Sequence, residues 1–120
     1  MQWVFPISPV AASRPRVSKW GSYYSGPYKT FRQDVQPIIV DVLGEWTPMA
    51  GPIDVTIGVY PTRPKTSKLD YPRPDIDNYV KAVLDSCNGI VWLDDNQIVK
   101  IAARKEWADE GYFTVEVNEL

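Results

Sequence analysis

The segment between Pro74 and Gly89 constrains the fold most strongly, because its apolar residues repeat with the period of a helix. The spacings between them place their side chains in one continuous stripe. A proline just before such a pattern and a glycine just after it are the usual boundaries of a helix. We therefore expect a helix over residues 75–88 that buries a stripe made of Ile76, Val80, Val83, Leu84 and Cys87.

A second helical pattern lies between Thr30 and Gly44. Thr30 and Gln33 form a possible capping box at its start, and Gly44 can close it. Pro37 interrupts the pattern, because a proline inside a helix removes a hydrogen bond and costs about 3 kcal/mol. We expect a helix that is kinked at Pro37 or begins after the capping box. Its apolar face comprises Val35, Ile38, Ile39 and Val42.

The remaining apolar segments alternate or are short, which is typical of strands. Residues 9–29 predict an ordered loop or a weak hairpin, and residues 61–74, with four prolines and four bases, predict a mobile basic loop. The sum is one mixed α/β (α+β) domain over residues 1–120, with two helices and a mixed sheet of four to five strands whose C-terminal pairs are antiparallel. The expected strands are 2–8, 53–60, 90–93, 97–107 and 112–117.

Composition excludes several classes of protein. The chain has 120 residues, one cysteine and no histidine. An intrachain disulfide, a zinc site built from several thiolates and any catalysis by a histidine base are therefore excluded. No apolar run approaches the roughly 20 residues that span a membrane, and the start of the chain lacks the pattern of a signal peptide. We expect a cytoplasmic protein that does not contact membranes.

Charge is divided unevenly along the chain. Residues 1–33 contain five bases and no acid, whereas residues 106–120 contain five acids and no base. A basic segment of this kind favours contact with a polyanion. Chance clustering on solvated loops is the alternative. The five bases are Arg14, Arg16, Lys19, Lys29 and Arg32.

Acidic residues gather at the start of the helix expected over 75–88. Asp75 and Asp77 flank its first turn, and Lys81 and Asp85 follow at four-residue spacings on the side opposite the apolar stripe. Carboxylates suit Mg²⁺, which neutralises the charge that phosphodiester hydrolysis builds on a phosphate and activates a bound water. A lysine one turn along can contact the phosphate. The alternatives are a helix cap and a solvated ladder of ion pairs.

A second acidic pair, Asp94 and Asp95, ends the strand expected over 90–93. It can share a metal ion with the first pair only if the tip of that strand returns beside the start of the helix. With Asn96, the two aspartates are also typical of an ordinary tight turn.

The residues around both acidic pairs resemble the signature of the RusA family of Holliday junction resolvases. The pattern D-x-D-N, K-A-x-x-D, N-G and D-D-x-Q-[IV] runs through Pro74–Asp85 and Asn88–Val99. Upstream, Ala12–Arg16 resembles the basic R-P-R element of one branch of the family. The chain departs from some members at Ala11–Ala12, where they have paired asparagines.

The resemblance implies a small homodimer that uses Mg²⁺ or Mn²⁺ to cut opposing strands of four-way DNA junctions. The catalytic residues would be Asp75, Asp77, Asp95 and Lys81, with Asp94 as an auxiliary metal ligand. The bases Arg14, Arg16, Lys19, Lys29 and Arg32 would hold the junction arms.

We therefore expect a Mg²⁺-dependent, structure-selective DNA endonuclease that resolves four-way junctions. Two other functions stay open on the sequence alone. One is a module that binds branched or single-stranded nucleic acid without cutting it. The other is an interaction protein whose acidic cluster contacts a basic partner.

Overall fold

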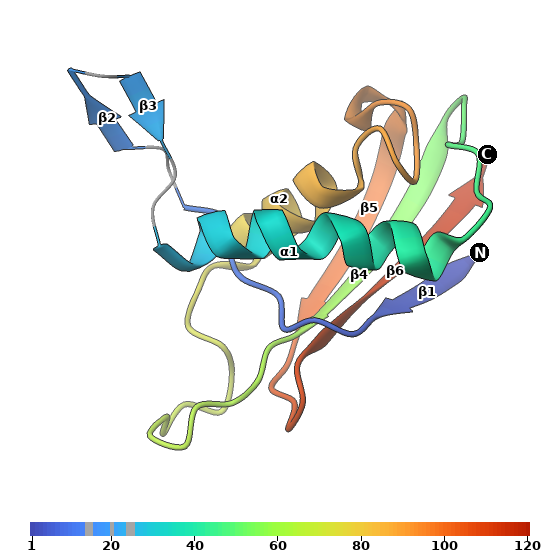
Figure 1. Ribbon diagram of the computed structural model, residues 1–120. Helices are drawn as coiled ribbons and strands as arrows, with labels where there is room; N and C mark the ends of the chain where they lie inside the picture. The colour runs from blue at the N-terminus through green and yellow to red at the C-terminus, as the bar shows by residue number, and fades with distance from the viewer. Residues whose placement is uncertain (14–15, 20, 24–25) are drawn as a thin grey trace.

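The computed structural model describes residues 1–13, 16–19, 21–23 and 26–120, with the backbone alone at 16–18 and 21–23. It has two layers, a four-stranded mixed sheet and two helices that cover one of its faces (Figure 1). The expected α+β class is confirmed. The elements are β1 Gln2–Phe5, β2 Arg16–Ser18, β3 Gly21–Tyr23, α1 Gly26–Leu43, β4 Ile53–Tyr60, α2 Ile76–Cys87, the 3-10 helix η1 Asp95–Gln97, β5 Ile98–Lys105 and β6 Tyr112–Glu119.

The strand order of the sheet is β1-β6-β4-β5. β4 pairs antiparallel with β6 and parallel with β5, which it reaches through α2. The antiparallel pairing expected between successive strands near the C-terminus is therefore wrong, and β6 pairs antiparallel with β4 and β1 instead. β5 and β6 are neighbours in sequence but do not pair, because β4 lies between them. β4 lies between β6 and β5, and its side chains at 53, 55, 57 and 59 are all buried.

The helices pack on the apolar face of the sheet. Val35 and Ile39 of α1 are fully buried there, as the helical pattern predicted, whereas Ile38 and Val42, expected on the same face, are only half-buried. α1 begins at Gly26 and continues through Pro37, so neither a start at the capping box nor a later start is correct. Pro37 and Gln33, whose carbonyl the proline leaves without a partner, are both exposed, so water can solvate that carbonyl.

α2 has the predicted bounds to within one residue, but a different face is buried. Ile76 is 38% exposed, whereas the ring of Tyr79 lies in the core. Two of the side chains on this face, Ala82 and Ser86, are small, and the hydroxyl of Ser86 donates to the carbonyl of Ala82 at 2.7 Å. The buried residues are Tyr79, Ala82, Val83, Ser86 and Cys87.

The strand expected over residues 90–93 is wrong. The amides of Ile90 and Val91 both donate to the carbonyl of Cys87, so the chain turns immediately after α2. Trp92 is fully buried and anchors the turn. An apolar run of four residues does not distinguish a strand from a buried turn. The tight turn expected at 94–96 is present and continues as η1.

A two-stranded hairpin formed by β2 and β3 stands apart from the sheet, at the left of Figure 1. It corresponds to the weak hairpin expected within residues 9–29. Among the described residues, no helix is long and apolar enough to cross a bilayer.

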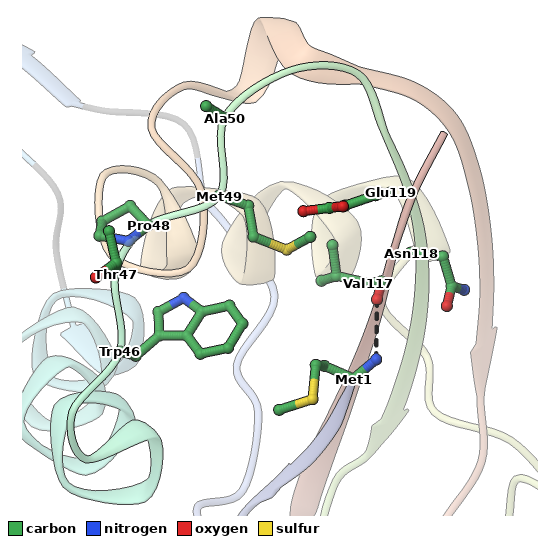
Figure 2. Close-up of a pocket in the computed structure, with 9 residues that line it drawn as sticks. All are labelled: Met1, Trp46, Thr47, Pro48, Met49, Ala50, Val117, Asn118 and Glu119. Carbon is green, nitrogen blue, oxygen red and sulfur yellow. Dashed lines mark hydrogen bonds between the residues drawn. The ribbon is translucent and has the colours of Figure 1, made fainter.

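A pocket of about 490 Å³ lies between the loop over residues 46–50 and the end of β6. Figure 2 shows Trp46 and Met49 on one wall, and the amino group of Met1 donating to the carbonyl of Val117 at 3.1 Å. Its described lining contains a single carboxylate, that of Glu119. The pocket is therefore not where the acidic residues of interest gather.

Candidate active site

Asp75 and Asp77 sit at the amino end of α2. Asp75 is the N-cap residue, with an extended backbone, yet its side chain makes no capping hydrogen bond. Asp77 lies in the first turn, and both residues are exposed. Within the described part of the chain, neither carboxylate takes part in an ion pair. Capping therefore does not account for the carboxylate of Asp75, and the two acids remain available to a ligand from solvent.

Lys81 is held towards the carboxyl half of α2. Its ammonium lies 3.2 Å from Oδ2 of Asp85, and the hydroxyl of Tyr28 on α1 donates to the same oxygen at 3.1 Å. Part of the expected ladder of ion pairs is thus present, with Lys81 paired to Asp85 rather than to Asp77. The lysine side chain is still 55% exposed, so its charge can act on a ligand at the surface.

Asp95 is fixed at the opposite end of α2. Its backbone amide donates to Oδ1 of Asn88 at 2.9 Å, and the indole of Trp92 donates to its carboxylate at 2.6 Å. Asn88 is the C-cap residue of α2. A buried tryptophan and a helix cap therefore orient this carboxylate.

Asp94 has a structural task in the same turn. Its side chain accepts from the amide of Asn96 at 3.1 Å, and the side chain of Gln97 accepts from the amide of Asp94 at 2.7 Å. Together they form a capping box. The amide group of Gln97 also donates to the carbonyls of Met49 and Gly51, which ties η1 to the loop that precedes β4.

The surroundings of Asp95 disfavour its negative charge. Partial burial raises the pKa of its carboxyl, and the hydrogen bond from Trp92 opposes that rise. Asp85 and Asp94 raise this pKa further, whereas Lys81 lowers it. The buried thiol of Cys87 also has a raised pKa, from burial and from the charge of Asp95. A cation placed here would relieve this excess of negative charge.

The two parts of the expected site lie towards opposite ends of α2 in one chain. The helix has 12 residues, so its ends are roughly 18 Å apart at 1.5 Å per residue. The described residues contain no group of three histidine, cysteine or acidic side chains that could hold a metal ion. The expected return of Asp95 to the start of α2 is wrong within a single chain, because the tight turn at 88–92 leaves η1 at the helix end.

The basic residues expected to bind DNA are only partly described. Arg14 lies outside the described residues, and Arg16 is described by its backbone in β2. Lys19 is exposed in the turn between β2 and β3, and Lys29 and Arg32 are exposed on α1. Because Tyr28 of α1 contacts Asp85, this end of α1 borders the acidic surface of α2.

Three residues that position the acidic groups were not identified from the sequence. Tyr28 binds Asp85 across 57 residues of chain, which no local pattern indicates. Asn88 and Trp92 lie close to Asp95 in sequence, but the sequence pattern places them only at the end of the expected helix and within the strand expected over residues 90–93. An indole three residues before a carboxylate in a tight turn was the one available signal.

The oxygen donors fit a hard divalent cation better than a soft one. Mg²⁺ usually takes one or two protein carboxylates and completes its shell with water and phosphate oxygens. Asp75 and Asp77 supply two such carboxylates at the amino end of α2. Among the described residues no third acidic side chain joins them, and Asp95 of the same chain is at the other end of the helix.

One family model and one known protein match most of the chain, including these residues. The family model for endodeoxyribonuclease RusA matches residues 6–118. The chain is also 31% identical over 134 aligned residues to the uncharacterized protein YqaN of Bacillus subtilis (strain 168). That similarity covers 93% of this chain and 91% of the Bacillus protein. Both matches span the acidic residues of α2 and η1.

Proposed function

Because the chain belongs to the RusA endodeoxyribonuclease family, we propose that it is a Mg²⁺-dependent, structure-selective endonuclease that resolves four-way DNA junctions by paired cuts. The observation that carries the proposal is the pair of exposed carboxylates at the start of α2 that make no cap or ion pair within the described residues. Two such acids repel a phosphate unless a cation lies between them. A module that only binds nucleic acid has no use for them there.

Asp75, Asp77 and Asp95 would hold the ion, as Mg²⁺ or with Mn²⁺ in its place. When bound, it supplies a Lewis acid that polarises the scissile phosphate and activates a water. Lys81 adds a positive charge against the same phosphate; Asp85 binds its ammonium, and Tyr28 donates to the same oxygen of Asp85. Trp92 and Asn88 orient Asp95. Asp94 acts mainly through the turn that it caps.

A homodimer would bring the separated carboxylates together. β5 is the outer strand of the sheet and has eight residues. Val99 and Ile101 on it are 62% and 43% exposed, and Ile76 of the neighbouring α2 is 38% exposed. A long apolar edge of this kind is a template for pairing with another chain. A two-fold axis would pair β5 antiparallel with its own copy.

Such pairing has a definite consequence for the acids. Full antiparallel register over β5 sets Ile98 opposite the partner subunit's Lys105. Lys105 marks the start of α2, because its ammonium donates to the carbonyl of Pro74 at 2.8 Å. Ile98 directly follows η1. The Asp95 of one chain is thereby carried towards Asp75 and Asp77 of the other, and the dimer gains two equivalent sites suited to paired cuts.

Replacing Ile101 with lysine is expected to convert the dimer to a monomer and to abolish junction cleavage. The added charge would be buried without a partner at the pairing edge. Sedimentation equilibrium measures the mass of the assembly. Val4→Lys is the matched control, because Val4 is 55% exposed on β1 at the other edge of the sheet. A dimeric, active Ile101→Lys chain would contradict pairing through β5.

The function itself is tested with a labelled synthetic four-way junction and a linear duplex of the same sequence. We expect Mg²⁺ to support cutting of opposing strands of the junction, EDTA to stop it, and the duplex to stay intact under the same conditions. Binding should weaken steeply with salt, because Lys19, Lys29, Arg32 and the bases at 14 and 16 would contact phosphates. Tight junction binding with no cutting in Mg²⁺ or Mn²⁺ would instead indicate a binding module.

A further inference from the structure

A cleft of about 470 Å³ lies between the loop over residues 61–74 and Trp107. Its walls include the exposed cations Lys68 and Arg73 and the apolar side chain of Leu69. This volume is within the range of small-molecule sites, roughly 300–1,000 Å³, so one nucleotide fits. None of these three side chains has a part in the proposed catalysis, and the DNA contacts proposed above lie elsewhere.

The cleft is fixed by hydrogen bonds between the loop and the residues after β5. The indole of Trp107 donates to the carbonyl of Leu69 at 2.9 Å, and the amide of Arg63 donates to the carbonyl of Ala108 at 3.0 Å. The loop is irregular, as its prolines predicted, yet it is attached at both of these points. A preformed cleft binds a ligand without the cost of ordering the loop.

The charge of the cleft suits a phosphate. Residues 61–74 contain four bases and one acid, so the loop carries +3. In the described part of the chain, neither Lys68 nor Arg73 is in an ion pair. Both cations line the cleft together with the indole of Trp107 and the apolar side chain of Leu69. An aromatic face bordered by cations is the arrangement by which proteins hold single-stranded nucleic acid.

The cleft adjoins the amino end of α2. Pro74 lines it, and Asp75 is the next residue. Lys105 ties the carbonyl of Pro74 to the end of β5, which fixes the cleft relative to the proposed metal ligands. A DNA strand whose phosphate lies at Asp75 and Asp77 would have a neighbouring nucleotide within reach of Trp107.

We propose that this cleft binds one unpaired nucleotide of the strand to be cut, with its base against the indole of Trp107 and its phosphate between Lys68 and Arg73. The proposal rests on the proposed function and deepens it, because it names the structural feature that the enzyme reads. Bases at a branch point are more easily unpaired than those in a continuous duplex. A site that needs one free base therefore selects branched DNA without reading its sequence.

The test uses a short single-stranded oligothymidylate with one central 2-aminopurine, a base whose fluorescence falls when it stacks. In EDTA, the wild-type chain should bind the probe and quench it. Trp107→Leu should remove the quenching and weaken binding about ten-fold, because stacking on an aromatic ring is lost. Trp107→Phe, which keeps a ring but loses the hydrogen bond to Leu69, should retain most of both signals.

The cations are tested through salt dependence. Lys68→Ala and Arg73→Ala should each lower the slope of log affinity against log salt by about 0.7, the value for one phosphate contact on a single strand. Lys65→Ala is the matched control, because Lys65 lies on the same loop, is exposed and does not line the cleft. It should leave quenching unchanged.

Three results would overturn the proposal: a probe that stays bright when bound, equal loss of quenching in Lys65→Ala, or displacement of the probe by a polyglutamate peptide at equal charge concentration. Because the assay contains EDTA, it is independent of cleavage. If the probe is not quenched but junctions are cut normally, the proposed nucleotide site in the cleft is wrong and the proposed nuclease activity stands. If the probe is quenched but the chain cuts no junction, the proposed nuclease activity is wrong and the nucleotide site stands.

Discussion

Replacing Asp77 with asparagine is expected to lower the rate of junction cleavage by about a thousand-fold, because the change removes a charged metal ligand whose ion contributes several kcal/mol to the transition state. Asparagine keeps the shape of the side chain. Loss of a negative charge in the first turn of α2 costs stability of only about 0.3–1 kcal/mol. Junction affinity should stay equal or rise, because one repulsion of phosphate disappears. Single-turnover cleavage and gel-shift assays measure the two quantities separately.

Asp41→Asn is the matched control for this experiment, because Asp41 is an exposed aspartate that lies on α1 rather than on α2 or η1. It should cut at the wild-type rate. A cleavage rate for Asp77→Asn within ten-fold of wild type would remove Asp77 from the metal site. A parallel loss of junction binding would mean that the aspartate supports the DNA surface instead.

Mixing two inactive variants is expected to restore cutting. Neither Asp77→Asn nor Asp95→Asn alone should cut, because each homodimer lacks a ligand in both sites. In a mixed dimer, one site combines the intact Asp77 of one chain with the intact Asp95 of the other. Random exchange of subunits makes half of the dimers mixed, so about a quarter of all sites regain their ligands. Nicking of a labelled junction after the two chains are mixed measures this fraction.

The same experiment discriminates between shared and separate sites. If each chain holds its metal with its own Asp77 and Asp95, every site in the mixed dimer carries one substitution and no cutting returns. Mixing Asp77→Asn with Lys81→Ala tests a different arrangement, since both residues lie on α2 of the same chain. In that mixture each chain carries one substitution on its own α2, and Asp95 is intact in both chains. Cutting should therefore return only if a site takes Asp77 from one chain and Lys81 from the other.

The sequence predicted the features that local patterns control. α2 and β4 have the expected bounds to within one residue, because Pro74 and Gly89 end the helix wherever it packs and strict alternation defines the strand. The buried face of α2 was predicted less well. Tyr79 displaced Ile76 from the core, and that choice depends on the sheet and α1 rather than on the helix alone. The prediction of a strand at Trp92 failed for a related reason, since a short apolar run packs equally well in a strand and in a buried turn.

The sequence shows the residues of the candidate site but not their arrangement. The two acidic pairs are visible in the sequence. Their separation along α2 follows from the turn after the helix, and the contact of Tyr28 with Asp85 joins residues 57 positions apart. Neither has a local signature. The catalytic assignments of Asp75, Asp77, Asp95 and Lys81 therefore stay predictions that the mixed-dimer experiment addresses directly.

The placement of the acidic groups at the two ends of α2 has a consequence for the cell that makes this protein. In the proposed arrangement, a newly synthesised chain would carry only half of each catalytic centre at either end of one helix and would not cut DNA by itself. Cutting would then begin only when two chains meet, so at low abundance the rate should rise with the square of protein concentration. The enzyme would be switched on by its own accumulation, without a dedicated inhibitor.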